Sequence, residues 1–269
     1  MDERVKEQDI RLGTMLFTMV EPHRGHEVEY NRWYERDHFY AGCMIGAYTF
    51  AGRRFVATRE LKQLRQPAGP NPITPDPMAG SYLALYWILA GHHDDWNRWA
   101  VDQVKWLHGN GRMFPHRDHI HTLLYRYRWS APREPDGVPA ELALDHDYPG
   151  LAVVVGQRSP DVDAAAVEAW YRAELLPELM GAGSPVSLCI TFSPLPLLGD
   201  APSDVPRSEA AEDRFLQLYF LDQEPASVWE QTMADHGAAL EKSGVASLLF
   251  CSPFVPTVVG TDTYTDRLW

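Results

Sequence analysis

The chain contains an internal repeat, and this feature constrains its fold more than any other. The segments "NRWYERDHF" (31–39) and "EAWYRAELL" (168–176) carry Trp-Tyr pairs that lie 137 residues apart, and the same spacing places the apolar run 14–19 on 151–156. Later, "LALYWIL" (83–89) matches "LQLYFL" (216–221), and "TLLY" (122–125) matches "SLLF" (247–250). Self-similarity over such a length indicates duplicated structural units. Each half is predicted to run strand, helix, strand, strand, helix, strand.

A βαββαβ unit forms a four-stranded antiparallel sheet with both helices on one face, which leaves the other face apolar and in need of a cover. Two units in one chain cover each other. The sequence therefore predicts an α+β fold of two tandem ferredoxin-like units whose sheets pack into an intramolecular α+β barrel. The first unit is expected at 10–132 and the second at 150–269, joined by a linker at 133–149 that is rich in proline and acidic residues.

Composition excludes several classes of protein. The formal net charge is −13 without a block of Lys or Arg, so nucleic acid and anionic membrane surfaces are not expected as partners. Apolar runs stay well short of the ~18 residues of a membrane span, and the first residues lack the apolar region of a secretory signal. Three scattered cysteines without CxxC spacing fit neither a disulfide framework nor a cysteine zinc site. These features favour a cytoplasmic protein.

One stretch resembles a known superfamily. In residues 15–56, a strand is followed by a helix bearing WYxxxH ("FTMVEPHRGHEVEYNRWYERDHF") and then by a strand bearing an arginine pair ("GAYTFAGRRFVA"). This pattern resembles the dimeric α+β barrel superfamily, in particular its EthD-like and polyketide cyclase-like branch. The resemblance implies the barrel fold. It leaves the activity open among cyclases, isomerases, lyases, cofactor-free monooxygenases and haem enzymes.

His38 is the leading catalytic candidate. It follows Tyr34 by four residues, so the two side chains are expected on one helix face. An imidazole with an ordinary pKa of ~6.5 suits proton transfer at neutral pH, and Tyr34 could orient it or donate to a carbonyl oxygen. The repeat places Leu175 opposite His38, and ten of eleven histidines precede residue 150. We therefore expect an active first unit and a degenerate second one; the alternative is that Trp33 and Tyr34 are core residues and His38 only ends the helix.

Further candidates lie on the strands. Alternation along "HRDHIHTLLYRY" predicts that His119, His121 and Tyr125 share one face, with His121 as a second acid or base. Arg54, next to Arg53 on the opposite face, could bind a carboxylate or enolate oxygen, or be salt-bridged at the sheet margin. Tyr86 and Trp33 could wall an aromatic ligand or be core. A zinc site would need a third ligand, such as His38, in a motif that the sequence lacks, so no metal is assigned.

Neither a GxGxxG, a Walker loop nor a GxSxG elbow occurs, so no cofactor is assigned. The sequence predicts a cofactor-independent enzyme in which His38 moves a proton on a hydrophobic or aromatic small molecule with a carbonyl or hydroxyl group, as a cyclase, isomerase or lyase. Two alternatives stay open: a non-catalytic small-molecule binding protein, and a haem- or metal-dependent oxidoreductase on the same fold. Further pairing into a homodimer also stays open.

Overall fold

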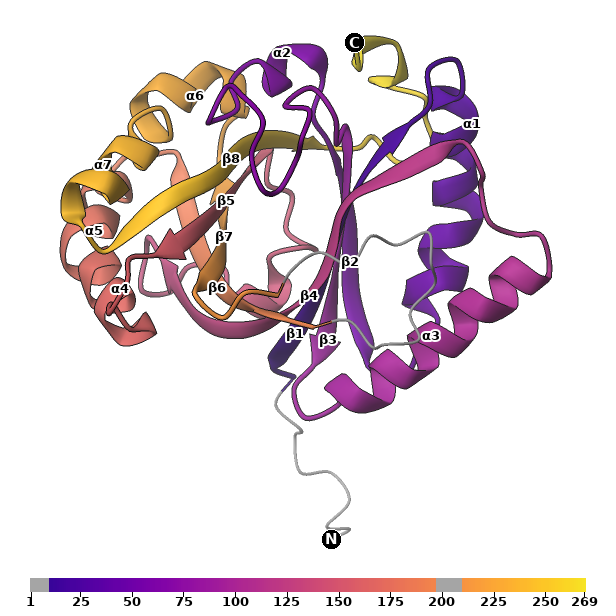
Figure 1. The fold of residues 1–269 in the computed structure, drawn as a ribbon, viewed down its shortest axis with the longest axis horizontal. Coiled ribbons are helices and arrows are strands. Elements are labelled where there is room, and N and C mark those ends of the chain that lie inside the picture. Colours follow the sequence, from indigo (N-terminus) through magenta and orange to yellow (C-terminus); the bar gives the residue numbers. More distant parts are fainter. Residues whose placement is uncertain (1–9, 197–209) are drawn as a thin grey trace, which may run out of the picture.

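A computed structural model describes residues 10–196 and 210–269 (Figure 1). The first half contains four strands, β1 (Leu12–Pro22), β2 (Thr49–Val56), β3 (Tyr82–Leu89) and β4 (Arg117–Pro132). One long helical segment joins β1 to β2 and consists of α1 (Glu27–Trp33), η1 (Tyr34–His38) and η2 (Tyr40–Met44). The short helix α2 (Arg59–Lys62) follows β2, and α3 (His93–Gly109) joins β3 to β4.

The second half repeats this order. Its strands are β5 (Gly150–Arg158), β6 (Val186–Leu195), β7 (Arg214–Leu221) and β8 (Ala246–Pro256). The helical segment after β5 consists of α4 (Ala164–Trp170), η4 (Tyr171–Leu175) and α5 (Leu176–Leu179), and β7 is followed by α6 (Pro225–Thr232) and α7 (His236–Ser243). No helix of the described ranges is long and apolar enough to cross a membrane. The first nine residues, considered above for a signal sequence, lie outside the described ranges.

The strands close into one antiparallel ring in the order β1-β3-β2-β8-β5-β7-β6-β4, which confirms the predicted α+β barrel. One seam between the halves is long, with β4 paired to β6 from Leu124↔Leu195 to Pro132↔Leu188. The other is short, with β2 meeting β8 at Phe55↔Pro256 and Val56↔Val255. Helices cover the outside of the barrel, α1 and α3 on one side and α4 to α7 on the other (Figure 1).

Alternation along the strands separates an apolar interior from a helix-facing outer surface. Inside the barrel, Trp87 is fully buried, lies 5.8 Å from Phe192 between ring centroids, and donates its indole N–H to the carbonyl oxygen of Ala140. Ala140 belongs to the segment between β4 and β5, where Ala143 and Leu144 are buried as well. This connecting segment therefore packs onto the barrel core.

Both halves widen their first helix at the same place. The α-helix gives way to a π-helical turn at Tyr34–His38 in the first half and at Tyr171–Leu175 in the second. Each π turn begins at the tyrosine of the repeated Trp-Tyr pair. A π turn bonds residue i to i+5, so side chains five apart come together, and such turns are frequent at functional sites.

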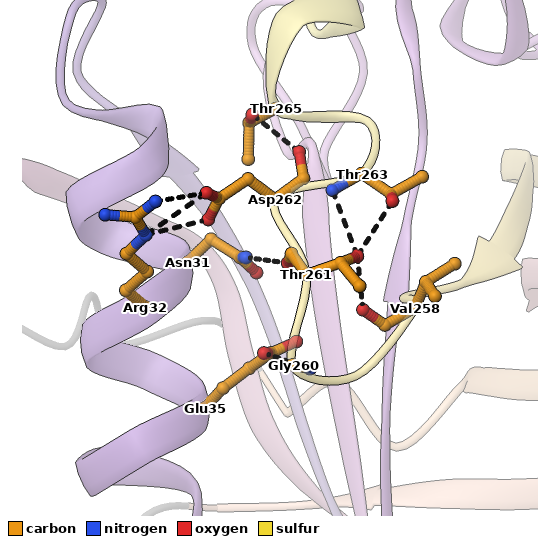
Figure 2. Close-up of polar contacts among 9 residues, drawn as sticks. All are labelled: Asn31, Arg32, Glu35, Val258, Gly260, Thr261, Asp262, Thr263 and Thr265. Carbon is orange, nitrogen blue, oxygen red and sulfur yellow. Dashed lines mark hydrogen bonds and ion pairs between the residues drawn. The ribbon is translucent and has the colours of Figure 1, made fainter.

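The C-terminal segment returns to the first half and holds α1 (Figure 2). Asn31 donates its side-chain N–H to the carbonyl oxygen of Thr261 at 2.9 Å, and Arg32 forms a two-pronged ion pair with Asp262. Glu35 accepts a hydrogen bond from the backbone N–H of Gly260 at 2.9 Å. The end of the second half thus fixes the helix that leads to His38.

Candidate functional site

The sheet of the first half separates the predicted site residues into two groups. On its helix-facing surface lie Trp33, Tyr34, His38, Arg54, Tyr86 and His119. Inside the barrel lie His121 and Tyr125, against Phe17. A single pocket cannot contain both groups, because the backbone of the sheet lies between them.

A β-bulge in β4 places His119 and His121 on opposite faces, so the expectation that they share a face is wrong. Met19 pairs with His121, but the next residue, Val20, pairs with His119, so Ile120 is an extra residue in β4. The extra residue breaks the two-residue alternation. His119 consequently turns toward the helices, where its Nδ1 lies 2.9 Å from the hydroxyl of Thr122.

His38 lies in an aromatic environment that the π turn creates. Its ring stacks on Trp33, five residues earlier, with ring centroids 4.5 Å apart and an interplanar angle of 18°. The edge of Tyr34 lies at 5.2 Å, and a Cβ atom on Gly42 would come within 2.9 Å of the imidazole Cε1. The glycine therefore gives the ring the room to lie flat against the helix.

The His38 imidazole is held neutral. Burial lowers its pKa from 6.5 to about 3, with a smaller contribution from the positive charge of Arg117. Its Nδ1 is buried and has no hydrogen-bond partner among the described residues. A buried polar atom normally has a partner, so this nitrogen is suited to bond a ligand or a water molecule.

The hydroxyl of Tyr34 is hydrogen-bonded to Tyr86 rather than to His38. Its hydroxyl lies 3.0 Å from that of Tyr86, both side chains are buried, and burial raises the pKa of both phenols. Tyr34 shares a face with His38 as expected, but it meets the imidazole through an edge contact between the rings. Tyr34 and Tyr86 therefore form a rigid neutral pair beneath the imidazole.

Arg54 packs under the same helix. Its Nη1 donates to Asn31 Oδ1 at 2.9 Å and lies 3.2 Å from Glu35 Oε1, while its guanidinium lies 4.5 Å above the ring of Tyr34 and 5.1 Å from that of Tyr82. Within the described ranges, the Arg54 Nη2 and the Tyr82 hydroxyl are buried without hydrogen-bond partners. Two donors and the His38 acceptor thus lie unpartnered at one helix–sheet seam.

His121 belongs to the barrel core. It is 3% exposed, its Nε2 lies 2.7 Å from the Tyr125 hydroxyl, and its ring lies 5.7 Å from Phe17. Burial lowers its pKa to about 4, with a smaller effect of Arg214. This geometry gives the imidazole a hydrogen-bonding role inside the core.

Comparison with known proteins shows the fold alone. No family model matches the chain, and no curated protein matches its sequence. Among solved structures, a protein assigned as a chlorite dismutase aligns with a TM-score of 0.54 and 11% identity over 96% of this chain and 100% of its own. An anthrone oxidase-like protein aligns with a TM-score of 0.51 and 9% identity over 94% and 95% of the two chains. The chain therefore has a dimeric α+β barrel-like fold, with distant likeness to these structures.

The described side chains form no cluster for a metal ion, and the second-half cavity offers no ligand for haem iron. No group of three or more His, Cys, Asp or Glu side chains that could hold a metal ion occurs among the described residues. A helix–sheet cavity of ≈410 Å³ in the second half contains no His, Cys or Met in its lining, although haem iron usually takes its axial ligand from such residues. Its one phenol, Tyr171, is bonded to His236 Nε2 at 3.2 Å. The described residues do not fit a haem here.

The sequence reasoning missed this second-half cavity, because it treated the second unit as degenerate after the loss of histidine. Arginines from "YRYRW" (125–129) line the cavity from β4, a strand of the first half. The signal was present in those alternating arginines. Their position opposite β6, across the long seam, is visible only in the barrel.

Proposed function

We propose that the chain is an enzyme that removes a proton from an aromatic small molecule bearing a carbonyl or hydroxyl group, at the helix–sheet seam of the first half. The observation that carries the proposal is the buried Nδ1 of His38, a neutral imidazole nitrogen without a partner among the described residues, on a ring stacked against Trp33. The EthD-like and polyketide cyclase-like resemblance belongs to the same proposal.

The proton would move from a neutral substrate to the neutral imidazole, and the two groups would then form an ion pair. Burial strongly disfavours a lone imidazolium, which is why the pKa of His38 lies near 3. A substrate that becomes an enolate or phenolate on losing its proton supplies the opposite charge, so the penalty for the isolated cation is offset. The Arg54 Nη2 and the Tyr82 hydroxyl would donate to the developing oxyanion.

We propose oxidation, rather than lyase or cyclase chemistry, as the step that follows. The anthrone oxidase-like protein suggests a fused aromatic ketone with an acidic CH₂ group as the substrate class. Loss of a proton to His38 gives a carbanion that dioxygen attacks. The sum is R₂CH₂ + O₂ → R₂C=O + H₂O, in which dioxygen is reduced, the CH₂ carbon is oxidised, and the proton from His38 leaves in the water.

Anthrone, supplied with air, tests this proposal through quinone absorbance and oxygen uptake. We expect His38→Gln to lower kcat by ~10²–10⁴, the usual contribution of a positioned proton acceptor, with an unchanged circular dichroism spectrum. The matched control is His93→Gln, a half-buried histidine at the start of α3. Full turnover by His38→Gln would contradict the role of His38. Product without oxygen uptake would indicate isomerase, lyase or cyclase chemistry instead.

A second candidate is a non-catalytic binding protein, which the second-half cavity of ≈410 Å³ favours. Such a protein would retain an aromatic ligand through purification and return it unchanged. Mass spectrometry of ligand recovered before and after aerobic incubation distinguishes the two functions.

A further inference from the structure

The second half contains a cavity of ≈410 Å³ between α4–η4 and the outer face of β5, β6 and β7, extending to β4. Its volume lies within the range of about 300–1,000 Å³ that small-molecule sites occupy. Trp129, Tyr171 and Phe215 provide aromatic walls, and all three are buried. The cavity is thus large enough for a ring-containing ligand, and its aromatic side chains can pack against that ring.

Its charge is the reverse of that of the whole chain. Four arginines line the cavity, against two glutamates, in a protein of net charge −13: Arg126, Arg128, Arg158 and Arg214 against Glu168 and Glu212. Glu168 is in turn ion-paired with Arg172 at 2.8 Å, which reduces its charge at the cavity. The cavity is therefore a local positive region on an acidic protein, and it favours an anion.

The arginines differ in how they are held. Arg158 donates to the backbone carbonyl oxygens of Val162 at 2.6 Å and of Glu212 at 2.9 Å, which fixes its guanidinium and leaves its charge uncancelled. Arg126 and Arg128 lie exposed on β4, and no acidic side chain of the described ranges forms an ion pair with either. These two guanidiniums are available to a ligand carboxylate.

Buried polar side chains lie among the aromatic residues that line the cavity. Gln217 is fully buried, donates to the Thr191 hydroxyl at 3.2 Å and accepts from the Tyr219 hydroxyl at 2.9 Å. Both Gln217 and Thr191 line the cavity. A purely structural helix–sheet contact would place apolar side chains here, so the polar pair is suited to orient an oxygen-bearing ligand.

We propose that this cavity is a second binding site, for an aromatic carboxylate. The ring packs against Trp129 and Phe215, and the carboxylate meets Arg126 and Arg128. A planar guanidinium matches the two oxygens of a carboxylate, which favours this anion over a spherical one. Aromatic walls favour a ligand with an apolar body over inorganic phosphate. His38 is not among the residues that line the cavity, so the proposal is independent of His38.

Isothermal titration of the full chain with 1-naphthoate tests the site. We expect one molecule bound per chain, and about tenfold or greater weakening in the double variant Arg126→Gln/Arg128→Gln. Arg98→Gln is the matched control, because Arg98 is an exposed arginine that pairs with Asp95 on α3, outside the cavity lining. Unchanged affinity in the double variant, or no binding to the unaltered chain, would overturn the proposal.

Occlusion and ligand chemistry provide independent readouts. Ala165 is exposed on α4 at the rim of the cavity, so Ala165→Trp should block binding while the melting temperature stays the same. Neutral 2-naphthol should bind more weakly than naphthoate, and inorganic phosphate should not compete. Competition by phosphate at a similar concentration would overturn the carboxylate assignment. His38→Gln should leave naphthoate affinity unchanged, and a loss of binding there would place the ligand in the first half instead.

Discussion

Stability should fall steeply below neutral pH, because three histidines are buried in the neutral form. Burial lowers the pKa of His38 to about 3 and that of His121 and His236 to about 4. In the unfolded chain each has an ordinary pKa of ~6.5. As the pH drops below that value, the unfolded state binds protons at these histidines and the folded state does not. The stability that these groups contribute is therefore complete above ~6.5 and is lost as the pH falls toward their folded values.

The size of the effect follows from these pKa values. Between about pH 7.5 and pH 5.5 each histidine should cost about 1.4 kcal/mol of unfolding free energy, or roughly 4 kcal/mol for all three. That is a large part of the ~5–15 kcal/mol that stabilises a typical domain. Glu21 acts in the opposite sense, because burial raises its pKa. Urea unfolding followed by tryptophan fluorescence at the two pH values measures the loss.

Glutamine substitutions identify the groups responsible. His121→Gln and His236→Gln can keep the hydrogen bonds to Tyr125 and Tyr171, at 2.7 and 3.2 Å, but cannot titrate. Each should reduce the pH-dependent loss by about 1.4 kcal/mol, whereas the same change at the exposed His146 should not. If both buried variants lose as much stability as the unaltered chain, burial of neutral histidine is not the cause and the reasoning fails.

Three further changes test other contacts. Gly42→Ala places a Cβ atom 2.9 Å from the His38 Cε1 and should displace the imidazole. Steady-state kinetics should then show about tenfold lower kcat, with little change in melting temperature. A normal kcat would contradict the tight packing of the ring. The Lys62 ammonium lies 4.0 Å from Glu21, and Lys62→Met removes that cation from a largely buried carboxylate. The free energy of unfolding in urea should fall by about 3–5 kcal/mol, and adding Glu21→Gln to the same chain should restore part of it. Asp262→Asn weakens an exposed ion pair to α1 and should leave the urea unfolding midpoint nearly unchanged, so a clear decrease would mean that the C-terminal segment holds the fold.

The architecture was accessible from the sequence because it depends on burial patterns that repeat. Apolar runs such as 83–89 and 216–221 became β3 and β7, and the need to cover two apolar sheet faces predicts one closed barrel. Local irregularities were not accessible. The extra residue at Ile120 reverses the direction of His119 relative to His121, and strict alternation has no means of placing it.

For the candidate site, too, the sequence predicted the residues but not their local geometry. Residue types selected His38, Trp33 and Tyr34, and the structure brings these three rings together. Regular helical spacing, however, pairs His38 with Tyr34 at i+4, whereas the π turn stacks it on Trp33 at i+5. A pattern with a period of 3.6 residues cannot anticipate a turn that contains one residue more.

The two π turns bear on how the halves came to differ. Both begin at the tyrosine of the repeated pair, so the wide turn persists in the second half, where Leu175 stands in the place of His38. An imidazole nevertheless contacts that tyrosine, since His236 reaches Tyr171 from α7. The turn itself therefore does not depend on histidine at its last residue. What distinguishes the first half is an imidazole at the last residue of the π turn, stacked on Trp33, and what distinguishes the second is a cavity lined by arginines. Under the two proposals, His38→Gln should leave naphthoate binding intact, and Arg126→Gln/Arg128→Gln should leave the oxidation of anthrone intact.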